Sequence, residues 1–221
     1  MSGLRISRFA GLMNAFLVDE DDGLTLIDTT MDPGAAKAIL GRASRPIVRI
    51  VLTHAHQDHV GGLDALAAEL PDAEVLISAR DAKLLAKDMT PEPDEPEDAK
   101  LRGGFPGAKT KPTRTLAPGD RVGSLEVFPA PGHTPGQLAF LDTRDRTLFA
   151  GDAYSTLGGV ATCAKPNPRF PIPALATWHR PTALQTAREL RALAPARLAV
   201  GHGKTVESPG AAMDAAIAKA S

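Results

Sequence analysis

The segment HAHQDH, residues 54–59, constrains this chain more than any other stretch of its sequence. Three of the six histidines and an aspartate occupy these six positions, directly after the apolar run PIVRIVLT (46–53). Imidazoles this close together repel one another when they are protonated. A folded chain that keeps them together must therefore hold them neutral or bind something between them.

Three further polar residues follow apolar runs in the same manner. His133 lies in PAPGHTPGQ, Asp152 in LFAGDA and His202 in AVGHG, each beside glycine where a predicted strand becomes a loop. Any one of them alone reads as an ordinary turn residue. Taken together they do not, because five of the six histidines lie at such junctions and only His179 does not. Strand ends followed by loops are where sites are built on sheet scaffolds.

Imidazole nitrogen and carboxylate oxygen are the ligands that zinc and similar divalent metals accept. Residues i and i+2 of an extended segment point the same way, so His54 and His56 can bind one ion. Asp58 and His59 lie beyond the bend and can turn towards a second ion. Metal bonding also removes the repulsion, because histidines that bind a metal stay unprotonated.

Short strands and helices alternate along the chain. The strands that we expect cover 15–18, 23–28, 46–53, 73–78, 121–132, 137–153 with an internal turn, and 196–203. The expected helices cover 33–40, 60–70, 79–89, 182–194 and 211–220. Residues 90–112 are rich in proline, glycine and charge, which is typical of a solvated surface loop and equally of a lid over a site. This pattern predicts an α/β fold with two sheets inside and helices outside.

The overall composition indicates one ordinary globular domain spanning residues 1–221. A net charge of −1 provides no electrostatic reason to expect nucleic acid or a membrane as a partner. The lone Cys163 fits a reducing compartment, and the basic and apolar N-terminus has no small-residue cleavage site after it. We therefore expect a cytoplasmic protein that acts on a small molecule, and a homodimer stays open.

These motifs, in this order, resemble those of the metallo-β-lactamase superfamily. The resemblance is carried by HAHQDH (54–59), PGHTPG around His133, GD (151–152) and GHG around His202, and LTLIDT with Asp28 looks like the family's first motif. It implies a four-layer αββα sandwich with a dinuclear metal centre at one edge of the sheets.

By matching motif, His54, His56 and His133 would hold the first ion. Asp58, His59 and His202 would hold the second ion, and Asp152 would bridge the two. Asp28 would not bind a metal itself but would hydrogen-bond to a ligand and orient it, or support the motif loop. The alternative is that Asp28 is only a turn residue after a strand. The two ions would be divalent, with Zn²⁺ expected first and Mn²⁺ or Fe²⁺ also suited to this donor set.

The resemblance implies hydrolysis of a small carbonyl substrate, a thioester, lactone or ester, by a metal-bound hydroxide that Asp58 orients as the catalytic carboxylate. Keeping an aspartate at 152 sets the chain apart from the family's β-lactamases. Three alternatives stay open: a mononuclear iron sulfur dioxygenase, an RNA phosphodiesterase, and a non-catalytic metal-binding module. Tyr154 and Trp178 are candidates for the substrate pocket, with core packing as the alternative for each.

Overall fold

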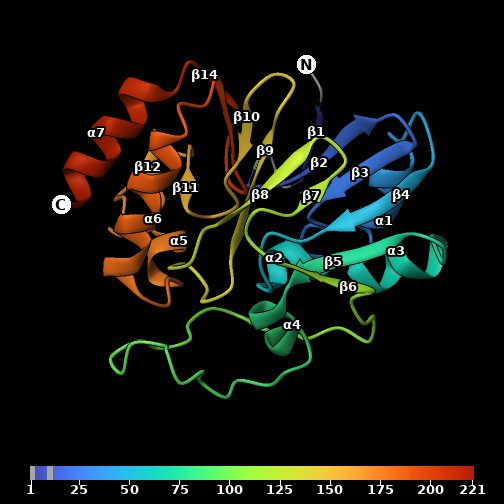
Figure 1. The fold of residues 1–221 in the computed structure, drawn as a ribbon, viewed down its shortest axis with the longest axis horizontal. Coiled ribbons are helices and arrows are strands. Elements are labelled where there is room, and N and C mark those ends of the chain that lie inside the picture. The colour runs from blue at the N-terminus through green and yellow to red at the C-terminus, as the bar shows by residue number, and fades with distance from the viewer. Residues whose placement is uncertain (1–2, 9–11) are drawn as a thin grey trace.

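The computed structural model describes residues 3–8 and 12–221. Two six-stranded mixed sheets pack face to face, with α6 and α7 on one outer side and α1 and α3 on the other (Figure 1). The predicted four-layer αββα arrangement is thus confirmed. Within the described residues, no helix is long and apolar enough to cross a bilayer.

The first sheet begins with a strand that the sequence pattern did not predict. Its spatial order is β1 (Gly3–Arg8), β2 (Met13–Glu20), β3 (Gly23–Ile27), β4 (Ile47–Val51), β5 (Glu74–Ser78) and β6 (Arg114–Leu116). β1, β2 and β3 are antiparallel, whereas β3 to β6 are parallel. Parallel strands need crossover connections, and these carry α1 (Ala35–Leu40), α2 (Gln57–Val60), α3 (Leu63–Glu69) and α4 (Ala79–Leu85).

The second sheet carries the C-terminal half of the chain. Its order is β14 (Val206–Glu207), β13 (Arg197–Ala199), β10 (Thr147–Phe149), β9 (Leu138–Asp142), β8 (Leu125–Pro129) and β7 (Arg121–Val122). A small hairpin of β11 (Tyr154–Ser155) and β12 (Ala161–Thr162) lies beside it, with α5 (Ile172–Leu175), α6 (Arg180–Ala192) and α7 (Gly210–Ala220). β10 and β13 are parallel, so the residues that follow them emerge at the same end of the sheet.

Both faces of each sheet are buried, which explains the nearly continuous apolar strands. The core between the sheets includes Phe16 from the first and Phe149 from the second, whose rings meet edge to face at 5.2 Å. A second apolar cluster joins the first sheet to α1, α3 and α4, and a third joins the second sheet to α6 and α7.

The predicted helix over 60–70 is interrupted at Gly61 and Gly62. A β-carbon on Gly61 would lie 1.9 Å from the Met31 carbonyl oxygen, and one on Gly62 would lie 2.5 Å from the Thr29 oxygen. The glycine pair therefore lets the loop that follows β3 pass close to the helix start. The same loop begins with Asp28, which lies beside the HAHQDH segment because β3 pairs with β4.

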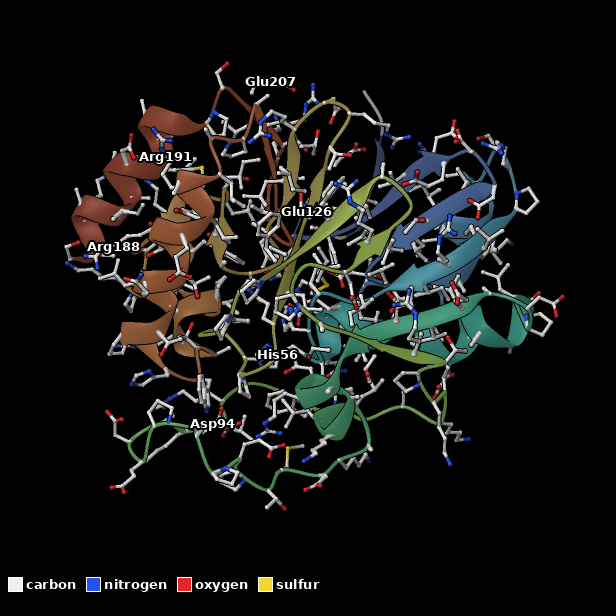
Figure 2. The ribbon with its side chains drawn as sticks, in the orientation of Figure 1. His56, Asp94, Glu126, Arg188, Arg191 and Glu207 are labelled. Carbon is white, nitrogen blue, oxygen red and sulfur yellow. The ribbon has the colours of Figure 1, made fainter. Side chains whose placement is uncertain are left out.

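The long loop is fastened to the body of the protein rather than free of it. Residues 86–113 have neither helix nor strand, but Leu101 and Phe105 pack on the apolar cluster that joins the first sheet to α1, α3 and α4. The Asp64 carboxylate also accepts hydrogen bonds from the backbone N–H groups of Lys109 and Thr110, at 3.0 and 2.8 Å. The loop runs below His56, and the labelled Asp94 lies on its outer part (Figure 2).

Candidate metal centre

The strand ends bring together all the residues that the sequence singled out as ligands. His54 and His56 follow β4, and His56 stands at the N-terminal end of α2, which carries Asp58 and His59. The remaining ligands follow three strands of the second sheet: His133 after β8, Asp152 after β10 and His202 after β13. Two groups result, His54 with His56 and His133, and Asp58 with His59, Asp152 and His202, and in each group the ligand atoms all lie within 4.8 Å of one another.

The three imidazoles of the first group form a nearly regular triangle. The ring centroids of His54 and His56 are 4.9 Å apart, those of His54 and His133 are 4.9 Å apart, and those of His56 and His133 are 4.7 Å apart. Each pair of rings is nearly perpendicular, at 86°, 88° and 83° respectively. Three rings turned about a common centre in this way suit one face of a metal ion's coordination shell.

Asp152 lies between the two groups. Its Oδ2 atom is 2.9 Å from Nε2 of His202 and 3.4 Å from Nε2 of His133, which belongs to the first group. Its Oδ1 atom is 3.3 Å from Nε2 of His59. One carboxylate therefore contacts both groups, which is the position expected for a bridging ligand.

In His54 and His59, the ring nitrogen that points away from the centre is fixed by a hydrogen bond to a hydroxyl or a carboxylate group. His59 Nδ1 lies 2.7 Å from Asp28 Oδ2 and donates to it. The Thr53 hydroxyl donates to the same carboxylate at 2.8 Å, which leaves its oxygen to accept from Nδ1 of His54 at 3.0 Å. Asp28 also accepts the Thr53 backbone N–H, so it orients the motif loop as well as one ring.

The other three rings are held in the same way. His56 donates from Nε2 to the Arg102 carbonyl oxygen at 2.8 Å, and His202 donates from Nδ1 to the Leu12 carbonyl oxygen. His133 Nδ1 lies 3.3 Å from the Thr177 hydroxyl, whose own hydrogen is directed to backbone carbonyls. A neutral imidazole has one N–H, so in rings kept neutral by a bound metal each outward donor would leave a bare nitrogen facing the centre.

Several of these inward atoms are buried without a hydrogen bond. They are Nε2 of His54, His59 and His202, and Oδ1 of Asp152. A buried polar atom without a hydrogen-bond partner costs about 1–3 kcal/mol of stability. Four such atoms at one place therefore indicate a binding site for a ligand. A divalent cation in each group would satisfy all of them, and the residues present therefore fit two metal ions.

The two groups differ in their electrostatics. Burial and the neighbouring imidazoles hold the pKa of His54 well below its usual value and that of His133 at about 3, so these rings stay unprotonated. Burial also lowers the pKa of His202, but Asp152 and Asp58 outweigh it and raise the pKa to about 10. The second group, with more carboxylates, thus attracts positive charge.

A cavity of about 250 Å³ opens onto both groups. Its polar wall contains Asp58, whose side chain is 24% exposed and is the most accessible carboxylate of the site. Gly103 and Gly104 of the long loop line it as well. Its apolar wall comes from Met13, Met31, Ile172, Pro173 and Ala176.

The structure does not bring the two aromatic candidates into this cavity. Tyr154 is fully buried among apolar residues of the second sheet and α6, and its hydroxyl donates to the Ala187 carbonyl oxygen at 2.7 Å. Trp178 lines a separate hollow under residues 89–101, although its backbone N–H donates to the His133 carbonyl oxygen. The core alternative therefore applies to Tyr154, and neither side chain lines the candidate substrate pocket.

Sequence reasoning missed several residues that shape the site. Thr53 and Thr177 fix imidazoles. Asp81 accepts hydrogen bonds from the loops that carry the first group. Only Thr53, next to the motif, had a local signal.

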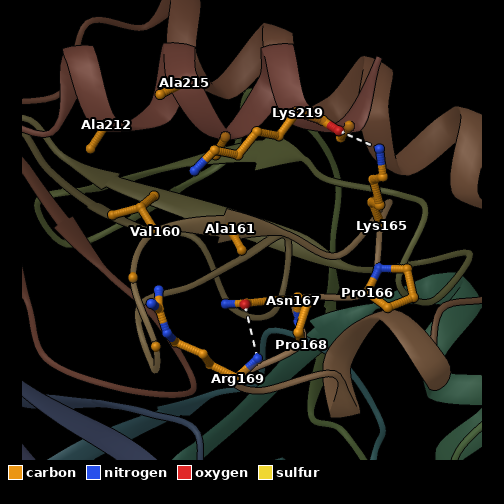
Figure 3. Close-up of a pocket in the computed structure, with 14 residues that line it drawn as sticks. Val160, Ala161, Lys165, Pro166, Asn167, Pro168, Arg169, Ala212, Ala215 and Lys219 are labelled. Carbon is orange, nitrogen blue, oxygen red and sulfur yellow. Dashed lines mark hydrogen bonds between the residues drawn. The ribbon is translucent and has the colours of Figure 1, made fainter.

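The largest cavities lie elsewhere. One of about 620 Å³ lies between the β12 region and α7, with Val160, Ala161 and Ala215 on its apolar walls (Figure 3). None of its lining residues belongs to either group of ligand atoms. Cavity size alone therefore does not locate the site, whereas the convergence of inward nitrogens does.

Comparison with known proteins agrees with this geometry. The sequence matches the Metallo-beta-lactamase superfamily over residues 9–202. It is 46% identical over 212 residues to the uncharacterized protein YobT of Bacillus subtilis (strain 168), covering 94% of this chain and 90% of YobT. It is 30% identical over 149 residues to a hydroxyacylglutathione hydrolase of Stenotrophomonas maltophilia (strain R551-3), covering 65% of this chain but only 46% of that enzyme.

Among solved structures, the fold resembles that of TTHA1623 in a di-iron-bound form. The TM-score is 0.67 at 25% identity, covering 94% of this chain and 96% of the other. Together, the matched length and the two groups of ligand atoms show that this chain is a metallohydrolase of the metallo-β-lactamase superfamily with two candidate metal sites.

Proposed function

We propose that this protein hydrolyses an ester, thioester or lactone bond in a small molecule, using two divalent metal ions. The observation that carries the proposal is that five imidazoles each have one nitrogen fixed by an outward partner and turn the other nitrogen towards two groups of converging ligand atoms. His54, His56 and His133 would hold one ion, and Asp58, His59 and His202 the other, with Asp152 shared between them. Zn²⁺ is our first choice, and the di-iron form of TTHA1623 supports iron as the alternative.

The bound ions would supply two effects, a lowered pKa for water and withdrawal of electron density from a carbonyl oxygen. The protein's own part falls to Asp58. Burial raises the pKa of Asp58, but His59 and His202 outweigh this and lower it below the usual carboxylate range. An ionised carboxylate at the cavity wall can orient a water molecule by accepting its hydrogen and can pass the proton on to solvent.

The shape of the cavity supports a small substrate. About 250 Å³ accommodates a compact acyl group, and the apolar wall that includes Met31 and Ile172 suits an aliphatic one. The relative named hydroxyacylglutathione hydrolase supports an acyl substrate. Because this chain spans less than half of that relative, glutathione itself does not follow from the match.

The test is elemental analysis of the purified protein combined with a substrate panel of simple esters, thioesters, lactones and a phosphodiester. We expect two equivalents of metal per chain and turnover of at least one acyl class, which Asp58→Asn abolishes. Glu126→Gln, a partly buried residue of β8 that belongs to neither ligand group, is the control. Turnover of only the phosphodiester, one iron with thiol-dependent oxygen uptake, or metal binding without turnover of any substrate would each overturn the proposal.

The proposal also covers the compartment, the partners and the oligomeric state. Free, buried Cys163 suits a reducing compartment such as the cytoplasm. We keep a small-molecule substrate as the partner, without nucleic acid or membrane, and leave a homodimer to be tested by light scattering.

A further inference from the structure

The buried carboxylate of Asp81, which no motif includes, joins the two loops that build the first imidazole triangle. Asp81 lies in the first turn of α4 and is 0% exposed. A buried carboxylate must find donors for its oxygens, because isolated burial of a charge is expensive. Its donors therefore show what this residue is for.

All three donors come from the segments that carry ligands. Asp81 Oδ2 accepts the backbone N–H of Ala55 at 2.9 Å and the hydroxyl of Thr134 at 2.8 Å. Asp81 Oδ1 accepts the backbone N–H of Gly136 at 2.9 Å. Ala55 separates the two histidines of the first group that follow β4, and Thr134 directly follows the third.

Asp81 packs closely against the loop that follows β8. A β-carbon on Gly136 would lie 2.6 Å from Asp81 Oδ1 and 2.5 Å from the Ser78 hydroxyl. Ser78 in turn accepts the Asp81 backbone N–H at 3.0 Å and so fixes the start of α4. The loop after β8 is therefore seated against a rigid helix start.

We propose that Asp81 is a positioning residue for the first metal site: it fixes the loop after β4 against the loop after β8, and thereby sets the spacing of His54, His56 and His133. This inference rests on the proposed metal centre. It concerns the first group only, because none of the three donors belongs to Asp58, His59 or the segments that carry Asp152 and His202.

The chain offers a matched control. Asp64 also accepts two backbone N–H groups and one threonine hydroxyl, from Lys109 and Thr110, at 3.0, 2.8 and 2.7 Å. It tethers the long loop on the surface, away from the ligands. Asp64→Asn therefore removes a carboxylate with the same kind of donors, none of which belongs to the loops after β4 and β8.

The experiment titrates the metal-free protein and its variants with Co²⁺ and follows the ligand-field spectrum of each ion. In Asp81→Asn, one acceptor oxygen becomes an NH₂ group that faces a donor. We expect the affinity of the first site to fall about 10–100-fold, while the second site and Asp64→Asn keep wild-type affinities. Thr134→Val, which removes one donor with little change of shape, should show a smaller loss at the same site.

Nitrogen NMR of the metal-free imidazoles provides a readout without metal. Asp81→Asn should mix the tautomers of His54, His56 and His133 and leave those of His59 and His202 unchanged. Wild-type behaviour of the first site in Asp81→Asn, or equal weakening of both sites, overturns the inference. If Asp81→Asn does not fold, Thr134→Val decides by the same criteria. If the wild type binds two ions but turns over no substrate, the proposed function fails while the positioning role of Asp81 is still measured.

Discussion

The carboxylate of Asp28 accepts a hydrogen bond from Nδ1 of His59 at 2.7 Å. Both side chains are buried, and the contact determines which nitrogen of His59 faces the second group. Asp28 has a backbone φ of 60°, a left-handed conformation that asparagine tolerates better than alanine. Asparagine is therefore the substitution that isolates the carboxylate.

We predict that Asp28→Asn lowers the metal affinity of the second group about 10–100-fold, because one of the two oxygens that accept from Thr53 and His59 becomes an NH₂ group and the His59 tautomer is no longer fixed. The metal retained after dialysis against a weak chelator measures this loss. Asp22→Asn, which removes an exposed carboxylate paired with Arg49, is the control and should retain both ions. Full retention in Asp28→Asn would show that Asp28 is only a turn residue.

We predict that His56→Ala abolishes hydrolysis, with a loss of more than 100-fold, because the triangle loses one inward nitrogen. The same change frees the Arg102 carbonyl and the ring of Phe105, whose centroid lies 4.6 Å from that of His56. Limited proteolysis should therefore cut the 86–113 loop faster in this variant. His179→Ala, the histidine outside the centre, should keep its activity. A fully active His56→Ala protein would contradict the site.

We predict that Tyr154→Phe affects stability and not substrate binding. The lost hydroxyl leaves the buried Ala187 carbonyl without that donor, which costs about 1–3 kcal/mol in the free energy of unfolding. Urea unfolding measures the cost, and KM for the best substrate of the panel should stay within twofold of wild type. A large rise in KM at unchanged stability would instead restore Tyr154 to the substrate pocket.

We predict that Cys163 does not react with thiol reagents in the folded protein. Burial raises its pKa to about 12, so the thiolate that attacks such reagents is scarce at ordinary pH. An unfolded thiol ionises near pH 8.5, and the stability that this difference contributes is complete below that pH and falls between about 8.5 and 12. Labelling rates at pH 7–10, with and without urea, check this. Rapid native labelling at pH 8 would contradict the burial.

Local signals in the sequence identified the candidate ligand residues and the class of fold. The pattern HAHQDH after a β-branched run, and single polar residues beside glycine at His133, Asp152 and His202, are read within a few positions, because strand ends and turns have local chemistry. The hairpin turn in DTRD and most helices follow from the same kind of information.

Tertiary structure alone decided how those ligands are held. In the sequence, Asp81 is an ordinary acidic residue of a predicted helix. It can hold two loops together only because α4 packs against segments 26 and 55 residues away in the chain. The place of Tyr154 close behind Asp152 in the chain favours the pocket, but its side chain packs against α6 in the core. The nitrogen of each imidazole that faces inward likewise depends on partners far away in the sequence. His202, for example, is oriented by the carbonyl oxygen of Leu12. Such contacts leave no periodicity in the sequence, because their energy depends on burial that only the assembled layers create.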